Sequence, residues 1–415
     1  MKNFLTNYDT CDDFVKSCIH NGKINIDHED FKYADSQWGV DEVRKCLVDN
    51  IFELVNFPIT RCSENVAADN FVKLCDFPIE LQLSKGNTVS RFEYETYKTK
   101  LYISNRNTQC LKVSDYFLHD NRMAVGTEKH PAPKVVWSEK KYINFLLKSI
   151  WRFKMFQINE NTLKSAIGNK YYICAQFNPS IAKCIYDTFK AERILDFSMG
   201  WGDRLCGFFA SKYGKHYIGV DPNVSNHACY NKEAEFLNGL LKNKKTYEFI
   251  IDGAEFVDYS KYYPLDLAFT SPPYFSKELY SDDEKQSFKN YKTDDAWKTG
   301  FLYKTMENIK KGLKENGYLI VNISDVNISD KRVLICDDMV KYAESIGYEY
   351  VGGFGMQLVK RPNKYDTLAF NPAEDIYVEP CFVFKNGKYD ENSEIDYQIR
   401  NSVLVEKKQK TKSLF

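Results

Sequence analysis

A hydroxyl group, two prolines and an aromatic ring follow one apolar stretch of the chain. The segment Asp266 to Tyr274 reads D-L-A-F-T-S-P-P-Y, and it predicts a buried strand at Leu267–Phe269 that ends in Ser271-Pro272-Pro273-Tyr274. Proline fixes φ and has no N–H to donate, so this strand end is rigid and its carbonyls point outward. The tetrapeptide thus offers fixed hydrogen-bond acceptors beside a ring. Pro-Pro pairs also occur in ordinary turns.

A second candidate site lies upstream, in the segment Arg193 to Asn223. A short apolar strand leads into a turn that contains Gly200 and Gly202, where the backbone can pass close to a ligand because no Cβ is present. A helix follows from Leu205 to Tyr213, and a second strand, His216–Val220, ends at Asp221. Nucleotide-binding βαβ units place a carboxylate on ribose hydroxyls about 20 residues after such a turn. The turn is not G-x-G-x-x-G, so a nicotinamide enzyme is not the first choice.

Together the two segments resemble the class I S-adenosylmethionine (AdoMet) methyltransferases, and among them the DNA amino-methyltransferases. Asp196, Gly200 and Gly202 match motif I of that family, D-P-F-x-G-x-G, while Phe197 and Ser198 depart from its Pro-Phe pair. The tetrapeptide at Ser271 resembles motif IV, (D/N/S)-P-P-(Y/F/W), in its S-P-P-Y form. That form is most typical of cytosine-N4 enzymes, whereas D-P-P-Y and N-P-P-Y are more typical of adenine-N6 enzymes.

Two further segments extend the resemblance. Gln176-Phe177-Asn178-Pro179 precedes a helix at Ile181–Phe189 and is similar to motif X, although a plain helix N-cap explains it nearly as well. A third strand, Tyr247–Ile251, ends at Asp252 and is similar to motif III. The resemblance implies that AdoMet is the cofactor. It also implies a set of cofactor-binding residues: Asp196, Ser198, Gly200, Gly202, Asp221, Asp252, Phe177 and Asn178.

The resemblance also implies a reaction, the transfer of a methyl group to an exocyclic amine of a nucleic-acid base. Ser271 and the Pro272 carbonyl are expected to accept the hydrogens of the amine, Pro273 to hold the turn rigid, and Tyr274 to stack on a flipped base. We therefore expect a site-specific DNA methyltransferase that favours N4 of cytosine. Three alternatives stay open: an adenine-N6 DNA enzyme, an RNA or tRNA base methyltransferase, and a non-enzymatic AdoMet-fold interaction protein.

The expected fold is α/β: a doubly wound, mainly parallel seven-stranded sheet of the Rossmann-like methyltransferase type with a mixed α+β N-terminal extension. The resemblance implies the strand order 3-2-1-4-5-7-6, with strand 7 antiparallel. Motifs in the order X, I, III and IV place target recognition outside the span from I to IV. We therefore expect an accessory or target-recognition region at 1–135, a methyltransferase domain at 136–390 and a basic tail at 391–415. Phe275–Asn290 and Gly352–Asn371 are expected to be catalytic and substrate loops.

Charge is unevenly distributed along this neutral chain of 415 residues. Residues 1–84 have a net charge of −7 and residues 85–170 a net charge of +9. Phosphate contacts depend on local charge, so the basic block predicts a nucleic-acid face that binds duplex or single-stranded DNA, or RNA, with Arg106 and Arg122 as candidates. A solvated basic surface is the other interpretation.

The 12 cysteines are scattered without a C-x-x-C pair, and the six histidines show no ligand spacing. No metal site is therefore expected, and many free thiols suit an intracellular, cytoplasmic setting. Neither a membrane-spanning run nor a signal-peptide core is apparent, so no membrane partner is expected. The oligomeric state cannot be predicted from these residues.

Overall fold

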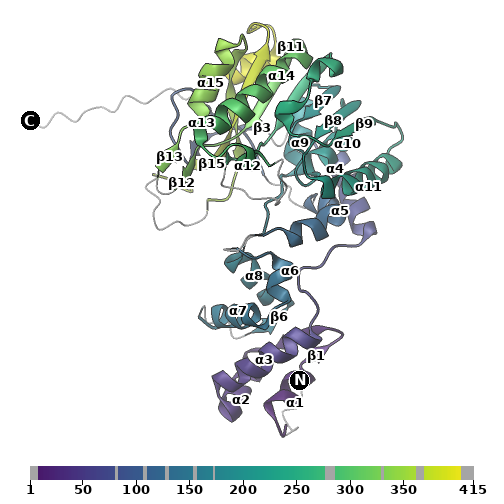
Figure 1. Cartoon of the computed structure of the whole chain (residues 1–415), viewed down its shortest axis with the longest axis vertical. Helices are drawn as coiled ribbons and strands as arrows, with labels where there is room; N and C mark the ends of the chain where they lie inside the picture. The colour runs from purple at the N-terminus through teal and green to yellow at the C-terminus, as the bar shows by residue number, and fades with distance from the viewer. Residues whose placement is uncertain are drawn as a thin grey trace, which may run out of the picture. The chain divides into compact units, whose positions relative to one another are not determined.

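The computed structural model describes residues 8–79, 83–105, 110–126, 130–152, 157–171, 173–275, 286–328, 331–360 and 369–402. The described chain forms two compact units (Figure 1). Among the described residues, unit 1 comprises those within 8–62 and 119–175, and unit 2 comprises those within 63–118, 176–275 and 286–402. Each unit is therefore built from separate segments of the sequence, and the division into functional regions at 1–135, 136–390 and 391–415 stays a prediction.

Unit 1 is mainly helical. Its elements are α1 (Cys11–Ser17), β1 (Ile19–His20), β2 (Lys23–Ile26), α2 (His28–Trp38), α3 (Val40–Leu54), α6 (Pro133–Trp137), α7 (Lys140–Arg152), β6 (Ile158–Asn159) and α8 (Glu160–Lys170). On α3, Val43, Leu47 and Ile51 are buried at helical spacing. They pack with apolar residues of α7 and α8 in one hydrophobic cluster, which forms the core of this unit.

Unit 2 contains the large sheet. The strands that form the expected seven-stranded core are β7 (Arg193–Asp196), β8 (His216–Val220), β9 (Thr246–Ile250), β10 (Leu265–Thr270), β11 (Leu313–Asn322), β14 (Glu349–Gln357) and β15 (Asp375–Asn386). They lie in the order β9-β8-β7-β10-β11-β15-β14, and β15 is antiparallel to both of its neighbours. In sequence order this is 3-2-1-4-5-7-6 with an antiparallel strand 7, so the predicted fold is confirmed.

Three strands from the N-terminal part of the chain extend this sheet. They are β3 (Leu83–Lys85), β4 (Asn87–Ser90) and β5 (Leu101–Ile103); β5 pairs with β14 and β4 pairs with the start of β15. The chain between β4 and β5 is a loop. Tyr94 and Tyr97 in this loop are buried against Phe382 of β15, so their aromatic rings cover the sheet instead of alternating along a strand.

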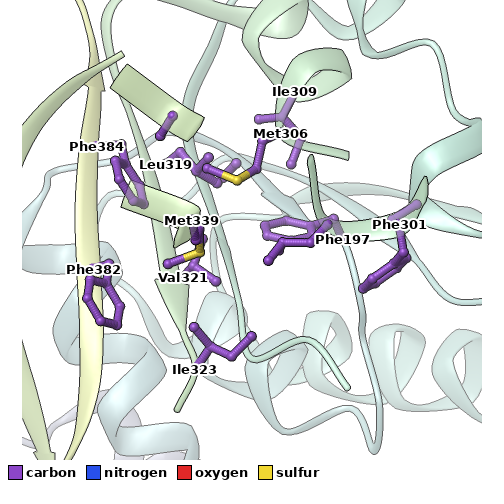
Figure 2. Packing of buried hydrophobic residues seen from close by; sticks show 14 of the residues in the cluster. Phe197, Phe301, Met306, Ile309, Leu319, Val321, Ile323, Met339, Phe382 and Phe384 are labelled. Carbon is purple, nitrogen blue, oxygen red and sulfur yellow. The ribbon is translucent and has the colours of Figure 1, made fainter. Parts of the chain in front are cut away.

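Helices cover both faces of the sheet. Successive side chains of a strand point to opposite faces, and in the central strands β8 and β10 the side chains on both faces are mostly buried. Leu319, Val321 and Phe384 point to the face covered by α14 (Lys304–Gly312) and α15 (Cys336–Ser345), where Met306, Ile309 and Met339 pack on them (Figure 2). On the other face, Phe269 packs against Tyr186 of α9 (Pro179–Thr188), and Tyr217 packs against Phe208 of α10 (Asp203–Ala210).

The remaining described elements connect or flank the sheet. They are α4 (Glu64–Cys75), α5 (Leu111–Ala124, which contains the boundary between the units), α11 (Val224–Leu240), the 3-10 turns η2 (Ala254–Phe256) and η3 (Tyr259–Tyr262), α12 (Ser287–Asn290), α13 (Asp294–Trp297), the π-helical turn η5 (Lys298–Tyr303), β12 (Val326–Ile328), β13 (Lys331–Val333) and α16 (Glu394–Arg400).

Several expected loops fall partly outside the described residues. Residues 276–285 of the expected catalytic loop, residues 361–368 of the expected substrate loop and residues 403–415 of the expected basic tail lie there. Of the rest of the expected substrate loop, residues 352–357 form the end of β14. Within the ranges given above, no helix has the length and apolar character needed to span a bilayer.

Candidate active site

The glycine turn and the Pro-Pro turn follow adjacent strands. β7 ends at Asp196 and β10 ends at Thr270, and these strands pair in parallel through Ile194–Leu267 and Leu195–Ala268. The carboxyl ends of parallel strands lie at the same edge of a sheet, which is where open α/β sheets bind ligands. The structure therefore brings Gly200 and Ser271 to one end of unit 2, as expected.

Asp196 joins the two turns. Its carboxylate is fully buried and accepts four hydrogen bonds, from the Arg204 guanidinium (2.9 Å), the Tyr217 hydroxyl (2.6 Å), the Thr270 hydroxyl (2.8 Å) and the Ser198 backbone N–H (3.3 Å). A buried carboxylate with this many donors is satisfied within the protein. Asp196 therefore holds the site in place and is not exposed to contact a cofactor directly.

Arg204 completes this anchor. Its guanidinium pairs with Asp196, donates to the Ser198 carbonyl and lies 5.2 Å from the centroid of the Phe177 ring. Burial alone lowers the pKa of Arg204, but the neighbouring Asp196 carboxylate outweighs it and raises that pKa above its ordinary value. Arg204 thus remains charged. It contacts three segments at once: the end of β7 at Asp196, the glycine turn at Ser198 and the segment before α9 at Phe177.

Gly200 lies where the backbone needs positive φ and open space. Its φ is +61°, and a Cβ built on it would meet no atom closer than 3.9 Å. The Gly200 N–H donates to Asp221 Oδ2 at 2.8 Å, and its carbonyl accepts from Asn226 and Tyr230 of α11. The turn is therefore fixed by its neighbours while the side on which a Cβ would stand stays open to a ligand.

Asp221 lies at the end of β8, beside this turn. Its side chain is 8% exposed and accepts hydrogen bonds from the backbone N–H groups of Gly200 (2.8 Å) and Asn223 (2.9 Å). Desolvation raises the pKa of Asp221 to about 6, although the two backbone donors act in the opposite direction. Each carboxylate oxygen has two lone pairs, so Asp221 can still accept hydrogen bonds from a bound hydroxyl.

Gly202 serves a different purpose. With φ of +77° it is the N-cap of α10, and a Cβ on it would lie 2.2 Å from Glu233 Oε2. Both Glu233 oxygens are buried and have no hydrogen-bond partner among the residues that the structure describes. Burial raises the pKa of Glu233 well above its ordinary value, with the Asp203 carboxylate adding to the effect. Gly202 therefore makes room for the buried Glu233 carboxyl group behind the turn.

The segment similar to motif X is anchored by Asp203. The Asp203 carboxylate accepts from the Phe177 N–H and the Gln176 amide, both at 3.2 Å. Asn178 is the N-cap of α9, with its side chain 2.9 Å from the Ser180 N–H and also bonded to Cys110 and Asn105. The side chain of Asn178 is therefore engaged as a helix cap, and the Phe177 ring lies between Arg204 and Phe269.

The Ser271 tetrapeptide is partly open. Ser271 is half-buried, and its hydroxyl lies 3.4 Å from the Tyr274 hydroxyl. Pro273 is half-buried, and its carbonyl accepts from the Phe275 N–H at 3.1 Å, which closes a tight turn with φ of +50° at Phe275. No described N–H donates to the Pro272 carbonyl, which leaves this acceptor available.

Tyr274 differs from its expected role. Its ring is 5% exposed and belongs to the apolar cluster beneath α14 and α15, and its hydroxyl lies 3.4 Å from the Asn322 carbonyl. Stacking needs an exposed ring face, so Tyr274 cannot stack on a base in this conformation. The sequence pattern could not predict this, because it does not show on which side of the turn the ring packs.

Asp252 follows β9 at the same end of the sheet. It is half-buried, and one oxygen accepts from the Gly253 N–H at 2.9 Å. Two apolar side chains beside it are unusually exposed: Ile251 at 45% and Phe256 at 58%. The carboxyl end of β9 therefore combines a carboxylate with apolar surface, beside Asp221 at the end of the adjacent β8.

Comparisons with known proteins give a limited likeness. No protein-family model matches the chain, and no curated protein matches it. Solved structures that match include an rRNA methylase from Streptococcus thermophilus, with 14% identity over 52% of this chain and 99% of that chain and a TM-score of 0.29. A TehB-like SAM-dependent methyltransferase from Corynebacterium glutamicum matches with 13% identity over 54% and 94% of the two chains and a TM-score of 0.31.

The N-methyltransferase NodS from Bradyrhizobium japonicum matches with 11% identity over 48% of this chain and 87% of that chain, at a TM-score of 0.29. Identities and TM-scores as low as these carry no argument about cofactor or substrate. The fold is established by the strand order of unit 2, a doubly wound sheet with one antiparallel strand between β11 and β14.

Proposed function

We propose that unit 2 binds AdoMet and transfers its methyl group to an exocyclic amine of a nucleic-acid base, with N4 of cytosine in DNA as the favoured acceptor. The observation that carries the proposal is the adjacency of two turns. Ser271-Pro272-Pro273-Tyr274 leaves β10 next to the glycine turn that leaves β7, and the Thr270–Asp196 hydrogen bond joins them.

The residues around Gly200 and Asp221 fit the proposed cofactor. Asp221 has free acceptor capacity for ribose hydroxyls, and the open side of Gly200 lets a ligand approach the backbone. Ile251 and Phe256 offer exposed apolar surface for an adenine ring, with Asp252 beside them to accept from its amine. Bound AdoMet would supply a methyl group already activated by its sulfonium.

The tetrapeptide supplies the other half of the chemistry. An exocyclic amine is a poor nucleophile because its lone pair is delocalised into the ring, so acceptors must draw its hydrogens towards a tetrahedral arrangement. The Ser271 hydroxyl can accept one hydrogen and the Pro272 carbonyl the other, both on a backbone held rigid by the two prolines. The buried Tyr274 contributes through its hydroxyl, which lies 3.4 Å from the Ser271 hydroxyl. Serine at the first position favours cytosine.

The direct test is the identity of the methylated nucleoside. The purified protein is incubated with methyl-labelled AdoMet and duplex DNA, single-stranded DNA or RNA, and each product is digested and analysed. N4-methylcytosine from DNA is the expected result. N6-methyladenine or a labelled RNA nucleoside would replace the cytosine assignment, whereas cofactor binding without transfer to any nucleic acid would overturn the proposed activity. An Asp221→Ala variant, which should bind AdoMet poorly, is the control for background label.

A further inference from the structure

A local excess of basic charge lies on two packed helices of unit 1 and the segment between them. Residues 140–170 contain seven lysines and arginines and a single acidic residue, Glu160. Within this span α7 (Lys140–Arg152) has no acidic residue at all. Most of the excess charge of the basic block at 85–170 therefore lies on α7, α8 and the segment between them.

The exposed side chains of α7 form one stripe. Lys141, Phe145, Lys148 and Arg152 are all exposed and lie at helical spacings of four, three and four residues. Residues at these spacings occupy the same face of a helix. The opposite face, which includes Ile143, Leu147 and Ile150, is buried in the core of unit 1. The stripe thus faces solvent, while the opposite face of α7 anchors the helix in the core of unit 1.

The next helix enlarges this surface. α8 packs against α7 in unit 1 and adds Lys164 and Lys170, both exposed (Figure 1). The Lys170 ammonium lies 5.3 Å from the centroid of the Phe145 ring, a cation–π contact that links the two helices. Phe145 is 55% exposed, so one face of its ring remains available for another contact.

Most of these cations lack an acidic partner. Lys141 pairs with Glu139 at 2.5 Å, but among the described residues no carboxylate lies within 4.0 Å of Lys148, Arg152 or Lys164. Unpaired cations grouped on one face repel each other and favour a polyanion. We name the surface formed by Lys141, Phe145, Lys148, Arg152, Lys164 and Lys170 the α7–α8 stripe.

We propose that the α7–α8 stripe is the face through which this protein binds the phosphate backbone of its nucleic-acid substrate, with Phe145 stacking on a base of a single strand. Regularly spaced cations contact phosphates, and an exposed ring among them gives a sequence-tolerant stacking platform. A membrane surface is disfavoured because Phe145 is the single apolar residue of the stripe, and membrane-bound helices insert a broad apolar face. The inference rests on the proposed function for the choice of polyanion.

This assignment replaces the two arginines expected from the sequence. Arg122 is 7% exposed and its guanidinium donates to the Cys174 carbonyl at 3.3 Å, so it cannot contact a phosphate from the surface. Arg106 lies outside the described residues.

The test compares two triple variants of the full-length protein. One replaces Lys148, Arg152 and Lys164 with alanine, and the control replaces Lys212, Lys242 and Lys261, which are exposed lysines of unit 2, so that the net charge falls equally. Binding to labelled duplex and single-stranded DNA and to RNA is measured by fluorescence anisotropy over a range of salt concentrations. For the stripe variant, the slope of log affinity against log salt should fall by about 2 to 3, since each lost phosphate contact removes roughly 0.7–0.9.

Phe145→Ala tests the stacking part separately. It should weaken single-strand binding by roughly five- to a hundredfold and leave duplex binding nearly unchanged. Equal slopes for the stripe variant, the control and the unaltered protein would overturn the inference. Binding to anionic phospholipid vesicles is measured as well. If the stripe variant lost vesicle binding while its nucleic-acid binding stayed intact, the inference would also be overturned. AdoMet binding is measured by calorimetry in parallel. Absence of AdoMet binding in the unaltered protein would refute the proposed function. A reduced salt slope in the stripe variant would still support nucleic-acid binding by the α7–α8 stripe.

Discussion

The Thr270 hydroxyl lies 2.8 Å from Asp196 Oδ1 and 3.2 Å from the Ser198 carbonyl, and so bonds the end of β10 to the glycine turn that follows β7. Ser271 is the next residue after Thr270. A buried threonine therefore joins the proposed amine-binding tetrapeptide to the proposed cofactor turn, in addition to the pairing of β7 with β10. Neither the glycines nor the prolines provide this link.

Replacing Thr270 with valine keeps the shape of the side chain and removes the donor. We expect a loss of about 1–3 kcal/mol in the free energy of unfolding, because the buried Asp196 carboxylate loses one of its donors. Thr305→Val is the matched control, since the Thr305 hydroxyl is buried without a partner among the described residues. Chemical denaturation should show Thr305→Val to be neutral or stabilising, and equal losses in the two variants would contradict the role of Thr270.

The pKa of about 6 at Asp221 predicts pH-dependent cofactor binding. Ribose hydroxyls donate to the ionised carboxylate, so binding should lower this pKa. AdoMet affinity should therefore rise as the pH increases through about 6 and level off above 7. Calorimetry of the unaltered protein and of Asp221→Asn measures this directly. The asparagine variant should bind more weakly, by roughly ten- to a hundredfold at pH 7.5, and show no rise; an identical pH profile in both proteins would exclude Asp221 as the responsible group.

Ser271→Ala tests the amine-binding role. The hydroxyl is proposed to act on the amine as it becomes nucleophilic, so turnover should fall by roughly ten- to a hundredfold while AdoMet affinity stays the same. Tyr274→Phe keeps the buried ring and removes the hydroxyl next to Ser271, and it should reduce turnover by a smaller factor without destabilising the fold. If Ser271→Ala lowered AdoMet affinity as strongly as turnover, the serine would be a cofactor ligand instead.

Substitution by alanine is expected to change stability in opposite directions at Gly202 and Gly239. Gly202→Ala places a Cβ against Glu233 at positive φ, so we expect a loss of about 1–3 kcal/mol. Gly239 lies in α11, where an added Cβ would meet no atom within 4 Å, and Gly239→Ala should gain about 0.4–1 kcal/mol. Thermal unfolding of both variants checks the pair. A Gly202→Ala protein as stable as the unaltered one would mean that Glu233 can move aside.

The parts of the fold that sequence could predict are those with a local pattern. Short apolar runs identified β8 and β10, and the positions of Gly200 and Asp221 predicted a ligand-binding turn after β7. The strand order followed from the resemblance of two motifs and was correct. Each of these features depends on residues close together in the sequence, which is why a linear reading was sufficient.

The parts that could not be predicted depend on contacts between distant residues. Arg204 and Thr270 were assigned no role from the sequence, yet both side chains donate hydrogen bonds to the Asp196 carboxylate. Burial reversed the expected roles of Tyr274 and Arg122, because an aromatic or basic residue in a polar segment can point inward once its polar atoms find a partner. The neighbouring residues in the sequence do not show whether such a side chain points into the core or towards solvent.

The place of β15 in the sheet governs when the sheet can form during synthesis. β15 (Asp375–Asn386) lies between β11 and β14, both of which precede it in the chain, and it also pairs with β4. A ribosome that has made every earlier strand has therefore produced two sheet edges that face each other with no strand between them. Unpaired strand edges of a partly folded chain are prone to associate with other chains. The sheet of unit 2 can consequently be completed only after β15 has been made, and a chain terminated before residue 375 would be released with both edges open.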